Sequence, residues 1–88
     1  MTSRTVTVAS TVGLHARPAA TFTRAAAAAG MAVTIAVPGK PPVNAASVLA
    51  VMTLGVDHGQ EVTLAAEGDG ADAALDGLVE LLATDLDG

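Results

Sequence analysis

The chain has 88 residues and carries four Lys and Arg against nine Asp and Glu, a formal net charge of −5 at pH 7. This length predicts a single domain, residues 1–88, and the negative charge with only one aromatic residue argues against nucleic-acid and anionic-membrane partners. The absence of cysteine excludes disulfides and thiolate chemistry and is typical of a cytoplasmic protein.

The first half of the chain alternates between strand and helix patterns. Residues 4–9 alternate apolar and polar side chains, and this period of two predicts a strand, as does the similar pattern at residues 31–37. Between them, apolar residues recur every three or four positions over residues 16–29, which predicts a helix that ends at Gly30. The proline-rich segment 38–42 then predicts a turn.

The second half repeats this alternation. Val43 and Asn44 predict a short edge strand, and residues 46–52 predict a brief helix that ends at Gly55. Residues 61–66 alternate as a fourth strand, and apolar residues from 71 to about 86 follow the pattern of an amphipathic helix. The order βαββαβα predicts an α+β fold, a two-layer open-faced sandwich in which three helices cover one face of a four-stranded antiparallel sheet. These patterns leave the strand order open.

The segment Gly13-Leu14-His15-Ala16-Arg17-Pro18 joins the first strand to the first helix. A helix start has unpaired backbone N–H groups and the positive end of the helix dipole, so it stabilises an anion. His15 supplies a nucleophile there, and Arg17 supplies a planar cation suited to phosphate oxygens. A histidine at such a junction is by itself more often an ordinary surface residue. The small residues around the imidazole, including Ala16 and Ala20, leave room for a partner, and the whole pattern indicates phosphoryl exchange between proteins.

The same segment, extended to Ala20, resembles the active-site motif of the HPr family, the histidine-containing phosphocarriers of the bacterial phosphoenolpyruvate-dependent sugar phosphotransferase system. Residues 44–49 and 53–55 are similar to the family's second signature, which surrounds a regulatory serine, here Ser47. The resemblance covers nearly the full length. The chain departs from the family pattern at residues 38–42, where a Pro-Pro pair replaces small polar residues.

The resemblance implies that His15 accepts a phosphoryl group on Nδ1 from phosphorylated enzyme I and passes it to a histidine of a sugar-specific enzyme IIA. It also implies that the backbone N–H groups of Ala16 and Arg17 hold this group and that the Arg17 side chain assists. The resemblance implies a phosphoryl carrier with a covalent phosphohistidine intermediate, rather than a standalone enzyme, and no sugar or cofactor is expected on it. Ser47 is interpreted either as a helix cap alone or as a cap that is also phosphorylated.

A short helix cannot bury all of its apolar side chains, so part of its surface is expected to serve partners. The expected docking patch for enzyme I and enzyme IIA consists of Ala20, Arg24, Val48, Leu49 and Met52. His58 lies in a turn-like sequence and is interpreted as a surface residue. The two histidines and the scattered carboxylates lack the spacing of metal ligands, so no metal site is expected.

Two other functions compete with the phosphocarrier hypothesis. The first is an HPr-like regulatory interaction module, in a nitrogen-type branch or in transcriptional or metabolic regulation, that does not feed sugar transport. The second is a small standalone enzyme, which is least favoured because neither a substrate pocket nor a second acid–base group is expected near His15. A monomer is the default expectation for the oligomeric state.

Overall fold

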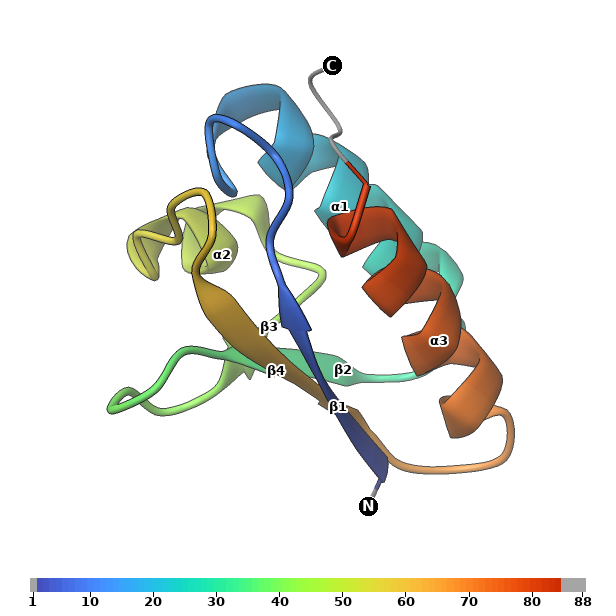
Figure 1. Ribbon diagram of the computed structural model, residues 1–88. Helices are drawn as coiled ribbons and strands as arrows, with labels where there is room; N and C mark the ends of the chain where they lie inside the picture. Colours follow the sequence, from blue (N-terminus) through green and yellow to red (C-terminus); the bar gives the residue numbers. More distant parts are fainter. Residues whose placement is uncertain (1, 85–88) are drawn as a thin grey trace.

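The computed structural model describes residues 2–84, and within this part the chain forms strands and helices in the predicted βαββαβα order (Figure 1). The elements are β1 (Thr2–Thr7), α1 (Ala16–Ala28), β2 (Val33–Ala36), β3 (Val43–Asn44), α2 (Val48–Thr53), β4 (Glu61–Ala66) and α3 (Ala71–Leu82). The strand order is β1-β4-β2-β3, and all neighbouring strands pair antiparallel. The predicted α+β fold is therefore confirmed.

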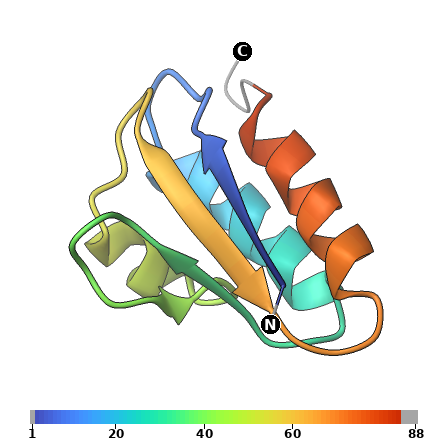
Figure 2. The ribbon, with the colours of Figure 1, turned by 60° about the horizontal axis from the view of Figure 1, so that its bottom comes forward.

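The three helices lie on one side of the sheet, behind the strands in Figure 2. The alternation of the strands explains this layering, because Val6, Ile35 and Val62 point to the helices and are buried. Phe22 of α1 is fully buried between the layers, and burial of a side chain of this size stabilises the fold by about 1.5–3 kcal/mol. Within residues 2–84, no helix combines the length and the apolar character that a bilayer crossing requires.

Several element boundaries differ from the predicted ones. The first strand spans Thr2–Thr7 rather than residues 4–9, because its ladder with β4 ends at the pair Thr7 and Glu61. Val8 continues the alternation and is buried, but its backbone bonds go to the turn before β4. The second strand is likewise shorter, Val33–Ala36, and α2 starts at Val48 rather than at residue 46. The described part of α3 ends at Leu82, and the predicted end near residue 86 lies outside the described residues.

Arg4 connects β1, an edge strand, to α3. It shares the helix-facing side of the strand with Val6, and its guanidinium donates hydrogen bonds to Asp72 and Asp76 at 3.0 Å each. The hydrogen bonds to Asp72 and to Asp76 raise the pKa of Arg4 above its ordinary value. All three side chains remain solvent-accessible, so salt screens both ion pairs. A charge on an edge strand also disfavours pairing with the strand of another chain.

Candidate functional site

His15 stands at the start of α1, as the sequence predicts. It is the N-cap residue, with an extended backbone (φ −125°, ψ 155°), and its side chain makes no capping hydrogen bond to the helix. The backbone N–H groups of the first turn, which begins at Ala16, therefore receive no side-chain acceptor from the cap. The imidazole is 40% exposed, so a partner protein can reach it.

Arg17 and Pro18 shape the first turn of α1 differently. Pro18 is buried, and its missing N–H costs little at a position where helix N–H groups have no intrahelical partner. Arg17 is exposed, and within residues 2–84 its guanidinium has no hydrogen bond or ion pair. No acidic residue occupies this first turn. The helix start thus combines the positive end of the helix dipole with one cation.

A backbone contact fixes the loop that carries His15. Gly13 has a φ of +70°, and a Cβ there would overlap the carbonyl oxygen of Val56 and lie 2.7 Å from the Cα of Asp57. The Leu14 N–H donates to the same Val56 carbonyl at 2.9 Å, and the Gly13 N–H donates to the Ser10 carbonyl at 3.0 Å. The loop before α1 lies directly against the segment before β4, and because of this close approach only glycine fits at position 13.

This contact brings a carboxylate next to the imidazole. Asp57 Oδ1 lies 3.6 Å from His15 Nε2, and the Asp57 side chain is 83% exposed. The prediction that no second acid–base group lies near His15 is therefore wrong. Sequence reasoning missed Asp57 because the run Asp57-His58-Gly59 has the composition of a surface turn. Whether this turn lies next to the loop of His15 depends on the strand order, which the sequence patterns leave open. His58 is exposed in this turn, as predicted.

Ser47 is the N-cap of α2, at the start of a different helix. Its Oγ accepts a hydrogen bond from the Ala50 N–H at 3.2 Å, which satisfies one N–H of the first turn. The Asn44 side chain supports the same entry by accepting from the Ala46 N–H at 2.9 Å. The predicted cap is confirmed, whereas phosphorylation of Ser47 stays a prediction.

The predicted docking residues lie on α1 and α2, two helices that contact each other. On α2, Leu49 is 78% exposed, and Val48 and Met52 are exposed to about half that extent. On α1, Arg24 is exposed and Ala20 is partly buried. Sequence reasoning missed one further apolar residue, Val12, which is 46% exposed in the loop before His15. Val12 lies in a turn, outside any run of regularly spaced apolar residues, so the sequence pattern did not indicate an exposed apolar side chain there.

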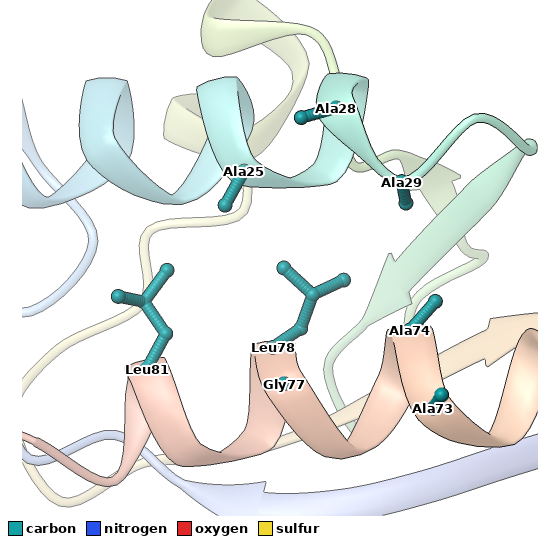
Figure 3. Close-up of a pocket in the computed structure, with 8 residues that line it drawn as sticks. All are labelled: Ala25, Ala28, Ala29, Ala73, Ala74, Gly77, Leu78 and Leu81. Carbon is teal, nitrogen blue, oxygen red and sulfur yellow. The ribbon is translucent and has the colours of Figure 1, made fainter.

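Two open grooves of the surface lie away from this site. One, of about 380 Å³, runs between α1 and α3 and is lined by small and apolar side chains (Figure 3). Another, of about 530 Å³, lies between the end of α1 and the strands β2 and β3. His15 lines neither groove. Across residues 2–84, no group of three or more His, Cys, Asp or Glu side chains is arranged to hold a metal ion.

Comparison with known proteins gives a consistent result over nearly the whole chain. Residues 2–84 match the protein-family model described as "PTS HPr component phosphorylation site". The phosphocarrier protein HPr of Streptomyces coelicolor is 52% identical over 87 residues, which cover 99% of this chain and 94% of that protein.

Solved structures agree in fold. The crystal structure of a phosphocarrier protein HPr from Bacillus anthracis has a TM-score of 0.86 and 34% identity, and the match covers 92% of this chain and 95% of that one. The Bacillus subtilis catabolite repression protein Crh, described as an intertwined dimer with a swapped domain, has a TM-score of 0.74 and 38% identity, with 97% of each chain covered. From the family match, the identity and the shared fold together, the chain belongs to the HPr family of phosphocarrier proteins.

Proposed function

We propose that this protein accepts a phosphoryl group on His15 from phosphorylated enzyme I and passes it to a sugar-specific enzyme IIA. The observation that carries the proposal is an exposed imidazole at a helix start where the N-cap side chain, His15 itself, makes no capping hydrogen bond, next to Arg17. Backbone N–H groups and the helix dipole stabilise an anion at this position without a basic cluster. The HPr family is the phosphocarrier family of the phosphotransferase system, which supplies the donor and the acceptor.

The proposed step is an in-line transfer to a ring nitrogen. The Nδ1 lone pair of the neutral imidazole attacks phosphorus, the bond between phosphorus and the donor breaks, and its electron pair remains with the donor. The N–H groups of Ala16 and Arg17 and the Arg17 guanidinium then hold the phosphoryl oxygens, since they stabilise negative charge in the transition state and in the product. Transfer to enzyme IIA follows the same path with His15 as the leaving group.

The surface around His15 suits contact with folded partners. We expect enzyme I and enzyme IIA to dock in turn on the exposed apolar residues of α2 and on the neighbouring face of α1. This patch consists of Ala20, Arg24, Val48, Leu49 and Met52. Met52 is an adaptable side chain, which is an advantage for a surface that binds two different proteins. The protein is expected to act as a cytoplasmic monomer.

A regulatory module that does not feed sugar transport is the less favoured function. The relative from Streptomyces coelicolor, which matches almost the full chain, is named as a phosphocarrier, and this chain has a histidine with an open helix start at position 15. Crh, named for catabolite repression, has the same fold at lower identity. Phosphoryl transfer to enzyme IIA separates the two functions.

The test is phosphorylation in a defined mixture. The protein is incubated with phosphoenolpyruvate and enzyme I, and its intact mass is measured before and after brief acid treatment. We expect one acid-labile phosphoryl group on the wild type and on His58→Ala, and none on His15→Ala, which keeps the fold because the side chain is exposed. Equal labelling of His15→Ala, or an acid-stable group, would refute the proposal.

A further inference from the structure

We infer that Asp57 is a positioning residue for His15, which directs Nε2 to its carboxylate and leaves Nδ1 as the nitrogen with the free lone pair. The inference deepens the proposed function, because it explains which ring nitrogen receives the phosphoryl group. It rests on two separate observations: the carboxylate faces Nε2, and the backbone of residue 57 lies directly against the loop that carries His15.

The first observation is the contact between the two side chains. Asp57 Oδ1 lies 3.6 Å from His15 Nε2, which is longer than a hydrogen bond but within the range of electrostatic attraction. A carboxylate only accepts hydrogen bonds, so it favours an N–H on the nitrogen that it faces. A neutral imidazole has a single N–H, and placing it on Nε2 leaves the lone pair on Nδ1. Hydrogen bonds of catalytic groups are often long in the free protein and shorten in the reactive complex.

The second observation is the rigid placement of residue 57. Its Cα lies so close to Gly13, two residues before His15, that no other side chain fits at position 13. The Gln60 N–H donates to the Asp57 carbonyl at 3.1 Å, and the Asp57 N–H donates to the Gln60 side chain at 3.3 Å. These bonds close the turn before β4. A single methylene connects the carboxylate to this fixed backbone, so few side-chain rotamers are available to it.

The same contact keeps a proton on Nε2 while the phosphoryl group is bound, so that the ring leaves as a neutral imidazole rather than as an imidazolate anion. With phosphorus on Nδ1 and a proton on Nε2, the ring carries a positive charge that the Asp57 carboxylate stabilises. When the acceptor's lone pair forms its bond to phosphorus, the electron pair of the bond between phosphorus and Nδ1 returns to the ring. The product is a neutral imidazole that again carries its proton on Nε2, so Asp57 faces the same N–H before and after transfer.

The experiment compares three variants of the full chain with the wild type. Asp57→Ala removes the carboxylate, and Asp57→Asn replaces it with an amide that can also donate a hydrogen bond to Nε2. Asp69→Asn is the matched control, because it removes the same charge from an exposed turn residue in the segment before α3. Thermal unfolding of each variant confirms that the fold is retained.

The first readout is the tautomer of His15, measured by long-range proton–nitrogen NMR at pH about 9, where an ordinary histidine is uncharged. We expect the Nε2–H tautomer to predominate in the wild type and in Asp69→Asn, to decrease in Asp57→Ala, and to decrease further in Asp57→Asn. The same tautomer population in all four proteins would overturn the inference. This measurement needs no partner, so it decides the inference even if His15 is never phosphorylated and the proposed function fails.

The second readout is the rate of phosphorylation by enzyme I. Because exposed charge pairs are screened by water, we expect Asp57→Ala to lower kcat by about threefold to fivefold with an unchanged KM, relative to Asp69→Asn. A raised KM with unchanged kcat would instead assign Asp57 to docking and would overturn its positioning role. Partial recovery of kcat in a fourth variant, Asp57→Glu, measured in this readout alone, would support the role of the carboxylate.

Discussion

The N-cap residues of α1 and α2 have similar backbone conformations but different side chains. Both helices follow a residue with extended backbone angles, His15 and Ser47. The Ser47 hydroxyl accepts a hydrogen bond from the third N–H after it, whereas His15 makes no such bond. The comparison teaches that a helix start leaves more N–H groups for an external anion when its cap supplies no internal acceptor. At α1, the helix start without an internal acceptor also carries a nucleophile, the His15 side chain.

The two helix starts are also positioned by different kinds of contact. At α2, the side chains of Asn44 and Ser47 bond to N–H groups two and three residues further along the chain. At α1, the preceding loop is held by Val56 and Asp57, which are distant in sequence. The side chains that bond at the capped start are close in sequence, whereas the open start also depends on contacts with a distant segment.

Substitution of Gly13 should produce the largest effect, because it removes the long-range support of the open start. In Gly13→Ala the added Cβ overlaps the Val56 carbonyl and the positive φ is strained, so we expect a loss of about 2–4 kcal/mol in the free energy of unfolding. Urea denaturation measures it. The control is Gly59→Ala, which has a similar φ but open space around the Cβ and should lose only about 1 kcal/mol. Equal losses in the two variants would contradict the proposed support.

Substitution of Arg17 tests whether the open start needs its cation. Arg17→Ala should slow transfer from enzyme I by about 10²-fold, the range found when one preorganised donor to a developing anion is removed. Binding to unphosphorylated enzyme I should change much less, which calorimetry measures. Arg17→Lys keeps the charge but not the planar fork, so its transfer rate should fall between those of the wild type and Arg17→Ala. A defect in docking alone would contradict this role.

Substitution of Ser47 tests the capped start. Ser47→Ala should reduce the free energy of unfolding by about 1 kcal/mol, because the Ala50 N–H loses its acceptor. Ser47→Asp keeps a capping oxygen and should retain most of the stability. Urea denaturation compares the three proteins. If both variants lose the same stability, the cap does not explain the contribution of Ser47.

The smallest expected effect comes from closing the open start. His15→Asn introduces a good capping side chain at an extended N-cap position, so it should raise the free energy of unfolding by about 0.5–1 kcal/mol. The same variant should accept no phosphoryl group. Denaturation and intact-mass measurements on one sample check both outcomes. A loss of stability would mean that the geometry at residue 15 does not allow capping.

The sequence predicts those structural features that depend on residues close to one another along the chain. Alternation in the strands identified the buried residues Val6, Ile35 and Val62, and the cap and glycine signals located the helix ends to within a few residues. Strand order was not predictable, because it depends on pairing between distant segments. β4 lies between β1 and β2, and this insertion places the turn of Asp57 beside the loop of His15. The motif thus located His15 and Arg17, but not the carboxylate beside the imidazole.

The contact between Gly13 and Val56 also couples activity to the completion of folding. The segment that supports the His15 loop comes much later in the chain, next to β4, so the loop lacks this contact until that segment is in place. A truncated or proteolytically nicked chain that lacks this later segment presents the histidine without its support. We therefore expect such fragments to be poorer phosphoryl acceptors than the intact chain.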